Sequence, residues 1–273
     1  MLKTKILVAT HKEYDYKIFP TCYLPIKVGN FSKTKADGYL CDNVGDNISD
    51  KNDIYCELTA LYWGWKNFDA DISGLCHYRR YFVSTLKTFK NYSTKILDEN
   101  KIISLLKHKK IILPKLGYRN INQPKLYDNT KKNNQDFHLM TIDKIIKSEY
   151  NEYTKSWIKY AYGNKVSWGN MFIAKMEYYK EYCEWVFPLL FKLEKAFKEK
   201  GKLEPRIMGF VSELLLCVWA DTRFKKKDIT YLPVINTEAK EKHTFVKRIL
   251  RVLNLYNLIQ SIGFKIKYLI KHY

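Results

Sequence analysis

Residues 52–82 read NDIYCELTALYWGWKNFDADISGLCHYRRYF, and this stretch decides the predicted fold. Its first half carries apolar residues that fall on one face of a helix, and Asn52 or Asp53 can cap the start of that helix. These apolar residues are Ile54, Leu58, Leu61, Tyr62, Trp65 and Phe68. The run Ile72–His77 (ISGLCH) then predicts a buried strand. A helix that leads directly into a buried strand is typical of a sheet covered by helices.

The same alternation continues on both sides of this stretch. We expect further strands at Lys5–Thr10, Ile111–Pro114, Val166–Ala174 and Ile229–Ile235. We expect further helices at Leu97–His108, Asp136–Tyr162, Met176–Lys200 and Arg206–Asp221. Pro188 should kink the third of these helices. Strands that alternate with helices predict an α/β fold with a mostly parallel sheet.

Composition excludes several classes of protein. The chain has 273 residues, of which 46% are hydrophobic and 15% aromatic, so it can bury a core and is not a disordered protein. With 11 Gly, 7 Pro and 6 Cys it is neither collagen-like, nor of low complexity, nor a disulfide scaffold. We find no secretory signal and no apolar run near the ~18 residues of a membrane span. The cysteines show no CxxC spacing, so we expect a reduced, cytoplasmic chain without a zinc site.

The chain is strongly basic. Lys and Arg total 48 and Asp and Glu total 28, which gives a net charge of +20. Such a charge suits an anionic partner, namely nucleic acid, anionic lipid or a phosphorylated small molecule. The lysines are scattered and form no stripe, and the aromatic residues cluster on apolar helical faces. This distribution disfavours a nucleic-acid-binding protein.

Two segments differ in composition from the predicted strands and helices. Residues 115–134 are rich in Asn, Lys and Tyr and too long for an ordinary connection, which favours a functional loop or lid. Residues 244–273 carry six basic residues, no acidic one, and an apolar stripe from Phe245 to Ile262. Such a tail can lie in a membrane interface or pack on the core, and both readings stay open. We therefore divide the chain into a domain over residues 1–240 and a tail over residues 241–273.

Residues 41–52, CDNVGDNISDKN, form the densest polar cluster. The register of an EF-hand calcium loop fails there: counted from Asp42, position 6 is Asn47 where Gly is needed, and position 12 is Asp53 where Glu is needed. Two interpretations stay open. The Asp and Asn side chains can satisfy backbone donors within an ordered loop, or the loop can present polar groups to a sugar or a ribose.

Residues 77–81, HYRRY, complete and follow the strand Ile72–His77. Ligands of open α/β sheets bind beyond the carboxyl ends of strands, and two adjacent arginines there suit a phosphate or diphosphate. Side chains alternate along an extended segment, so Arg79 and Arg80 should point in opposite directions, one to the ligand and one to a structural carboxylate. Ordinary salt bridges for both are the alternative. Residues 69–71, DAD, mimic a D-x-D metal motif but precede the strand, so we interpret them as a solvated turn.

Two further segments carry candidate site residues. Glu213 borders the apolar face of the helix Arg206–Asp221, where it can act as a general base for a sugar hydroxyl; a surface Glu is the alternative. Residues 168–171, WGNM, form a polar and aromatic bend that suits sugar stacking and hydrogen bonding, although a core Trp fits equally well. The sequence has no GxGxxG, P-loop, GxSxG or HExxH motif, which removes Rossmann dehydrogenases, P-loop kinases, common esterases and zincins.

Long motifs resemble those of one bacterial family, in the same order along the chain. They include VATHK (8–12), GYLCDNVGDNIS (38–49), KNDIYCELTALYWGWKN (51–67), GLCHYRRYF (74–82) and GFVSELLLCVWADT (209–222). The family is a capsule, exopolysaccharide and O-antigen glycosyltransferase family that was first catalogued as a domain of unknown function (DUF4422). Its members include galactofuranosyltransferases. The resemblance runs from about residue 5 to residue 235 and leaves the basic tail outside.

The resemblance implies a GT-A-like fold and transfer of a sugar from a nucleotide donor. UDP-galactofuranose is the leading donor, with UDP-galactopyranose and UDP-N-acetylglucosamine as alternatives. The acceptor is expected to be a lipid-linked glycan, and the enzyme to be peripheral on the inner face of the plasma membrane. A D-x-D motif at a strand end is missing, so we assign no metal ligand, and dependence on Mn²⁺ or Mg²⁺ stays open. A non-catalytic module that binds an anionic polymer is the rival from another class.

Each matching motif carries over a set of expected site residues. Donor-binding residues would be Thr10, His11, Lys12, Asn47, Ser49, His77, Tyr78, Arg79 and Arg80. Acceptor-binding or sugar-binding residues would be Asn170 and Met171, and Trp168 joins them from the adjoining polar and aromatic bend, which the matching motif does not include. Glu213 is the expected base of an inverting single displacement, and Asp46 is the next candidate for a catalytic carboxylate.

Overall fold

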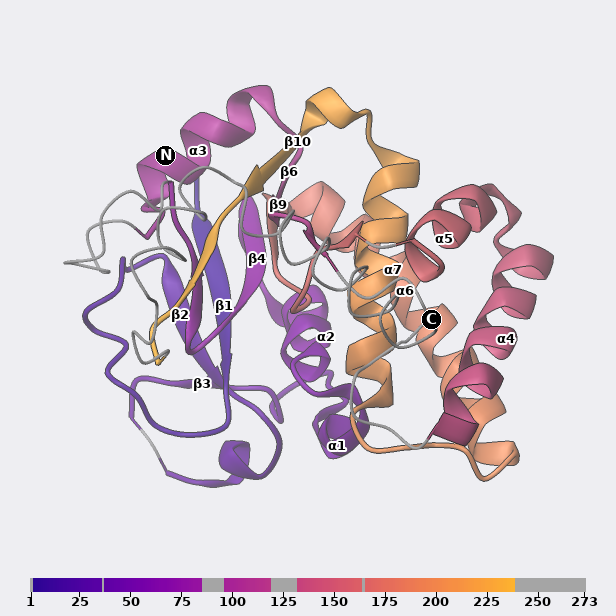
Figure 1. Cartoon of the computed structure of the whole chain (residues 1–273). Coiled ribbons are helices and arrows are strands. Elements are labelled where there is room, and N and C mark those ends of the chain that lie inside the picture. Colours follow the sequence, from indigo (N-terminus) through magenta and orange to yellow (C-terminus); the bar gives the residue numbers. More distant parts are fainter. Residues whose placement is uncertain (1, 36, 85–95, 119–131, 164, 239–273) are drawn as a thin grey trace, which may run out of the picture.

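The computed structural model describes residues 2–35, 37–84, 96–118, 132–163 and 165–238 (Figure 1). Its helices are α1 (Asn52–Tyr55), α2 (Leu58–Asn67), α3 (Glu99–His108), α4 (Lys132–Glu149), α5 (Thr154–Ala161), α6 (Met176–Glu199) and α7 (Ile207–Arg223). Its strands are β1 (Thr4–Thr10), β2 (Tyr23–Lys27), β3 (Leu40–Cys41), β4 (Ile72–His77), β5 (Arg80–Phe82), β6 (Ile111–Pro114), β7 (Gly117–Tyr118), β8 (Lys165–Val166), β9 (Phe172–Lys175), β10 (Ile229–Leu232) and β11 (Val234–Asn236). Residues 119–131 of the expected lid and the whole basic tail lie outside the described residues.

A nine-stranded sheet forms the centre of the molecule. Its main path runs β3-β2-β1-β4-β9-β6-β10, and β5 and β11 extend it beyond the end of β4. All neighbours on this path pair in parallel, except that β9 is antiparallel to both β4 and β6. The predicted α/β fold with a mostly parallel sheet is therefore confirmed. A separate two-stranded sheet pairs β7 with β8.

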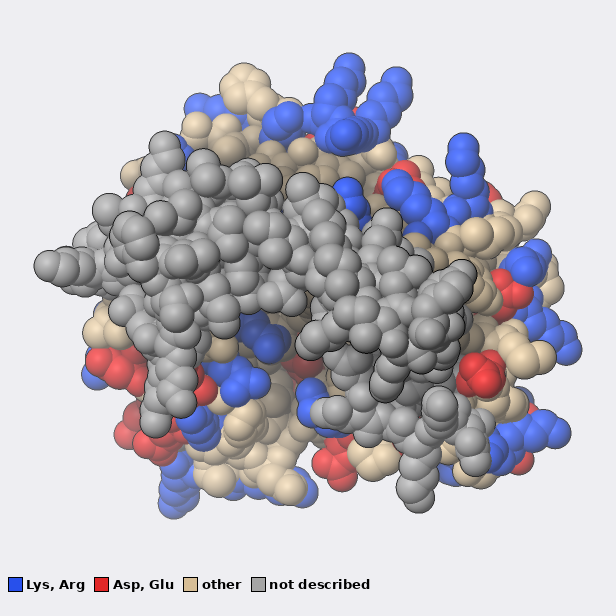
Figure 2. Space-filling model, in the orientation of Figure 1, with Lys and Arg blue, Asp and Glu red and all other residues tan. Residues whose placement is uncertain are grey.

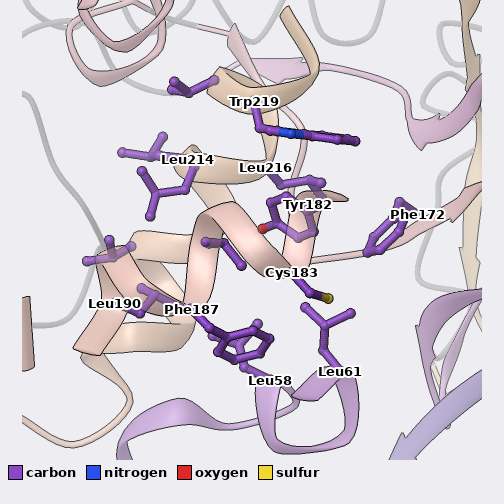
Figure 3. Packing of buried hydrophobic residues seen from close by; sticks show 14 of the residues in the cluster. Leu58, Leu61, Phe172, Tyr182, Cys183, Phe187, Leu190, Leu214, Leu216 and Trp219 are labelled. Carbon is purple, nitrogen blue, oxygen red and sulfur yellow. The ribbon is translucent and has the colours of Figure 1, made fainter. Parts of the chain in front are cut away.

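Side-chain alternation divides the sheet into two buried faces. On β1, Leu7 packs into the larger core cluster and Ile6 into the smaller one, and both are fully buried. The larger cluster holds the apolar faces of α2, α6 and α7, and Figure 3 shows Leu58, Phe187 and Trp219 of these helices pointing into it. The smaller cluster lies under α3. Because both faces are covered, the strand reads as a continuous apolar run, as expected for a parallel strand.

Four predicted elements are shorter in the structure than the sequence indicates. The helix that starts at Asn52 breaks at Cys56, whose φ of 52° and ψ of −131° are not helical, and resumes as α2. The helix expected over 136–162 divides into α4 and α5. The strand expected over 166–174 divides into β8 and β9 around a turn, and the one over 229–235 divides at Pro233 into β10 and β11. β2 has no predicted counterpart.

The parallel strands bring several carboxyl ends to one edge of the sheet. β1 ends there at Thr10, β4 at His77, β6 at Pro114 and β10 at Leu232. The opposite edge carries Asp69 and Asp71: the Lys3 ammonium lies 2.5 Å from Asp69, and the backbone N–H of Lys3 donates to Asp71. These acidic residues form the solvated turn that their position predicts.

The described surface carries both signs of charge. Figure 2 shows Lys and Arg side chains spread over the visible face with acidic groups between them. Within the described ranges, no helix combines the length and the apolar character that crossing a membrane requires.

Candidate functional site

The HYRRY segment forms a tight hairpin at the carboxyl edge of the sheet. His77 ends β4 and pairs with Arg80, the first residue of β5, so the two residues between them make the turn. The guanidinium of Arg79 lies 3.7 Å from the carboxylate of Glu238. The guanidinium of Arg80 lies next to Gly169, where an added Cβ would be 3.5 Å from Nη1. The two arginines therefore have different neighbours, but the cause is the turn at Tyr78 and Arg79 and not the alternation of an extended segment.

Glu213 of α7 lies beside this hairpin. Its carboxylate accepts a 2.9 Å hydrogen bond from the backbone N–H of Gly169. Burial and the negative charge of Glu57 raise the pKa of Glu213 to about 8, against the opposing effects of the Gly169 hydrogen bond and of the Arg80 and Arg206 guanidinium groups. A carboxyl with a pKa near the working pH suits a general base. Glu213 is thus not the solvated surface carboxylate that was the alternative.

The WGNM bend is a turn between β8 and β9. Gly169 and Asn170 have φ values of 92° and 50°, and the second is unusual for a residue with a side chain. Trp168 is 43% exposed, which rules out the core Trp and leaves its ring open to a ligand. Met171 is 1% exposed and belongs to the smaller core cluster. Met171 therefore packs in the core, which corrects its expected contact with an acceptor.

Asn170 is also buried, and its amide is engaged within the protein. Its Nδ2 donates to Glu57 Oε1 at 2.8 Å and to the carbonyl oxygen of Gly209 at 2.9 Å. Its Oδ1 accepts from the Ser212 hydroxyl at 2.7 Å. Asn170 fixes the turn against α2 and α7, which corrects the expectation that it faces an acceptor.

Glu57 is the residue of this group that the sequence reasoning missed. It lies in the break between α1 and α2, and its side chain is 15% exposed. Its Oε1 lies 3.8 Å from His77 Nε2. One signal was available, because Glu57 is three residues after Ile54 and four before Leu61, so it places a carboxylate on the predicted apolar face.

The side chains of the polar loop after β3 form hydrogen bonds with one another and with α2. Asp42 is fully buried, and its carboxylate accepts hydrogen bonds of 2.6 Å from both Ser49 and Thr59. Burial raises the pKa of Asp42, and the hydroxyl donors lower it. Asn47 donates to the carbonyl of Gly45 and accepts from the N–H of Ser49. Of the two interpretations of this loop, the structure favours the one in which its side chains satisfy one another.

Within the described residues, no hydrogen bond or ion pair joins Asp46, Asn47 or Ser49 to Glu213. Asp46 is exposed and accepts from the Tyr62 hydroxyl at 3.1 Å, while its carbonyl accepts from Asn67. Tyr62 lies near the middle of α2 and Asn67 is its last residue, whereas Glu57 directly precedes the helix. The role of Asp46 as the next candidate for a catalytic carboxylate stays a prediction. Asn47 and Ser49 form hydrogen bonds within their own loop, and their roles at the donor stay predictions.

The residues after β1 form a second polar group on the other side of the hairpin. The Lys12 ammonium lies 2.7 Å from the Glu238 carboxylate. The Tyr78 hydroxyl lies 3.4 Å from the same carboxylate, and the Tyr78 ring meets the His11 ring edge to face. Thr10 is buried, and its hydroxyl donates to the carbonyl of Lys12, so it shapes the turn and is not open to a ligand.

A family model described as "Domain of unknown function (DUF4422)" matches residues 5–226. The chain belongs to this family. The match extends from β1 to the end of α7 and leaves out only β10 and β11 among the strands. It therefore includes every residue described above around Glu213. No curated protein sequence matches the chain significantly.

The fold of this DUF4422 protein is similar to that of one solved glycosyltransferase. The apo structure of the bifunctional glycosyltransferase WbbM superposes with a TM-score of 0.72 at 23% identity, over 87% of this chain and 46% of WbbM. The chain thus spans less than half of the length of WbbM. The mannosyltransferase Ktr4p from S. cerevisiae matches over 86% of this chain and 70% of its own, at 14% identity and a TM-score of 0.35.

The DUF4422 protein brings cations and carboxylates together on both sides of the hairpin. Across the described ranges, no group of three or more His, Cys, Asp or Glu side chains is arranged to hold a metal ion. The side chains that line the two sides of the hairpin are basic, namely Arg80 and Arg206 near Glu213, and Lys12 and Arg79 near Glu238. Such a pair of sites can bind phosphate oxygens through cations and receive a proton on a carboxylate.

Proposed function

We propose that this DUF4422 protein is a nucleotide-sugar-dependent glycosyltransferase. The observation that carries the proposal is the Glu213 carboxylate, which accepts from the Gly169 N–H at the carboxyl edge of the sheet and interacts with the charges of Arg80 and Arg206. Ligands of open α/β sheets bind at this edge. The fold shared with WbbM supports the same class of reaction.

The chemistry of the proposed reaction is a single displacement with inversion. The donor diphosphate lies beyond the strand ends, where Arg80 and the Lys12–Arg79 pair neutralise its charge. The acceptor hydroxyl oxygen forms a bond to the anomeric carbon while the bond from that carbon to the phosphate oxygen breaks, and the nucleoside diphosphate leaves with the electron pair. The hydroxyl proton passes to the carboxylate of Glu213. The exposed ring of Trp168 provides a stacking surface for a sugar.

The donor and acceptor follow from the family resemblance. Our leading assignment is galactofuranose from UDP-galactofuranose, transferred to a lipid-linked glycan during capsule, exopolysaccharide or O-antigen synthesis. UDP-galactopyranose and UDP-N-acetylglucosamine are the alternative donors. We place the enzyme on the inner face of the plasma membrane, where residues 244–273 would contact anionic lipid. We expect the reaction to need no metal ion, because the residues that face the diphosphate are already cationic.

The rival proposal is a non-catalytic module that binds an anionic polymer, and one experiment separates the two. The purified chain is first screened by thermal shift against UDP, GDP and a panel of nucleotide sugars. Sugar transfer is then measured for the wild type and for Glu213→Gln, which keeps the shape and removes the proton acceptor. A general base contributes about 10²–10⁴ in rate, so the variant should lose that factor while its UDP affinity stays the same. No nucleotide-dependent shift, with binding of any polyanion that weakens steeply with salt, would support the rival.

A further inference from the structure

Glu57 is a mostly buried carboxylate whose partners determine its position. Asn170 Nδ2 donates to its Oε1 at 2.8 Å, and His77 Nε2 lies 3.8 Å from the same oxygen. Burying a carboxylate costs free energy unless hydrogen bonds and opposite charges compensate. The backbone break at Cys56, with its positive φ of 52°, directs the chain so that Glu57 meets both partners.

The Gly169–Asn170 turn connects Glu57 to Glu213. Asn170 contacts Glu57 through its side-chain amide, and the N–H of Gly169 donates to Glu213 at 2.9 Å. The carbonyl oxygen of Gly169 lies 2.6 Å from His77 Nε2. A carbonyl only accepts, so this nitrogen carries the hydrogen and His77 is held against the same turn. A change at Glu57 therefore reaches Glu213 through its charge and through this turn.

We propose that Glu57 is a positioning residue that controls when Glu213 holds a proton and that orients the Glu213 carboxylate through the Gly169–Asn170 turn. This inference rests on the proposed role of Glu213 as the base. Glu57 itself is not placed against the sugar or the reacting atoms.

The charges around Glu213 explain why Glu57 has this effect. Two nearby carboxylates disfavour double ionisation, so the negative charge of Glu57 favours the protonated form of Glu213. Arg80 from β5 and Arg206 from the start of α7 oppose this effect. The thiol of Cys56 also lies nearby, but burial raises its pKa to about 12, so it stays neutral at the working pH. His77 faces Glu57 from β4.

The test compares pH profiles of kcat for the wild type, Glu57→Gln and a matched control. Glu57→Gln removes the charge and keeps an oxygen that can accept from Asn170. On the acid side of the profile, kcat of Glu57→Gln should therefore increase with pH earlier than kcat of the wild type. We expect this acid limb to move to lower pH by about half a pH unit or more. Glu184→Gln makes the same chemical change on the exposed face of α6 and should leave the limb in place. A merely structural role for Glu57 would lower kcat at every pH and would not displace the limb.

A second measurement does not depend on turnover. The carboxyl carbon of Glu213 is titrated by NMR in ¹³C-glutamate-labelled protein and assigned by its loss in Glu213→Gln. In Glu57→Gln this titration should also move to lower pH. If the Glu213 titration and the acid limb are both unchanged in folded Glu57→Gln, the inference is wrong.

The two proposals fail in different ways. If Glu213→Gln keeps near-normal turnover, Glu213 is not the base, and the proposed mechanism fails. If Glu213→Gln is inactive and Glu57→Gln leaves the profile unchanged, the mechanism stands and the role assigned to Glu57 does not.

Discussion

The ammonium group of Lys12 lies 2.7 Å from the carboxylate of Glu238, although 226 residues separate them in the sequence. Arg79 and the Tyr78 hydroxyl approach the same carboxylate at 3.7 Å and 3.4 Å. Glu238 is held there by the β5–β11 pairing, which continues into a hydrogen bond from Thr237 N–H to the Arg79 carbonyl. A carboxylate thus occupies the place between two cations where a phosphate would bind in the proposed reaction.

Removing the charge of Glu238 should strengthen binding of UDP. In Glu238→Gln, Lys12 and Arg79 no longer have an anionic partner, so the phosphate groups of UDP meet no competitor. Exposed ion pairs are weak, so we expect the UDP dissociation constant to fall by only about two- to fivefold. Isothermal titration calorimetry measures the change, with Glu199→Gln at the exposed end of α6 as the control. Weaker binding by Glu238→Gln would mean that this carboxylate contacts the nucleotide directly.

Arg80 should contribute more to UDP affinity than Arg79. Within the described part of the chain Arg80 has no carboxylate within 4.0 Å, whereas Arg79 has Glu238. A charge-assisted hydrogen bond contributes about 1.5–3 kcal/mol, so Arg80→Ala should weaken UDP binding about tenfold or more. Arg79→Ala should weaken UDP binding clearly less, because the charge of Arg79 is already partly compensated by Glu238. If both variants bind UDP with the affinity of the wild type, the hairpin is not part of the donor site.

Glu213→Gln should stabilise the protein at alkaline pH. The pKa of Glu213 is raised from 4.5 to about 8 in the folded chain, so the folded state keeps a proton that the unfolded state releases. The stability that this proton contributes is complete below about pH 4.5 and is lost as pH rises through 8. Because Gln does not titrate, the melting temperature of the variant relative to wild type should increase between pH 5 and pH 8.5. A difference that is constant with pH would contradict the raised pKa.

Asp42 should matter for stability and not for the donor. Asp42→Ala removes the carboxylate that accepts the short hydrogen bonds from the Ser49 and Thr59 hydroxyls and leaves a cavity at a fully buried position. We expect the free energy of unfolding to fall by about 2–4 kcal/mol, measured by urea denaturation. Asp46→Ala, in the same loop but exposed, should change it by no more than about 0.5 kcal/mol. In folded Asp42→Ala, UDP affinity should be unchanged, and a selective loss of affinity would return this loop to the donor site.

Removing residues 244–273 should separate membrane binding from catalysis. The six basic residues contribute about 1 kcal/mol each near an anionic surface. The shortened protein should bind UDP normally but no longer sediment with anionic liposomes, and it should be slow only with lipid-linked acceptors. A melting temperature lowered by several degrees, with weak liposome binding by the intact chain, would show instead that the tail packs on the core.

Local signals in the sequence predicted the fold well where an element depends on one pattern. The strands at Ile72–His77 and Ile111–Pro114 were predicted to the residue, because both are continuous apolar runs covered on two faces. β2 was not predicted, because a proline such as Pro25 within a short apolar run argues against a strand. The proline is tolerated since β3 pairs with β2 only at Ile26 and Lys27.

The site was predictable only in part, because hydrogen bonds between distant segments decide it. The place of Glu213 beside the apolar face of its helix followed from helical spacing, whereas the different neighbours of Arg79 and Arg80 result from the hairpin turn. The burial of Asn170 did not follow from local spacing, since it depends on contacts with Glu57, Gly209 and Ser212. The break at Cys56 did not either, because no Gly or Pro marks it.

The central place of β9 has a consequence for the order of events during synthesis. β9 lies between β4 and β6, so two strands made earlier are joined only after residues 172–175 have left the ribosome. The hydrogen bonds around Glu213 span 44, 92 and 113 residues, and these distant contacts slow folding. In the nascent chain, β4 and β6 therefore stay unjoined and Glu57 lacks Asn170 until residues 170–175 emerge, and Glu213 is added only with α7. Binding of a nucleotide to ribosome-bound chains should consequently begin only at lengths beyond α7.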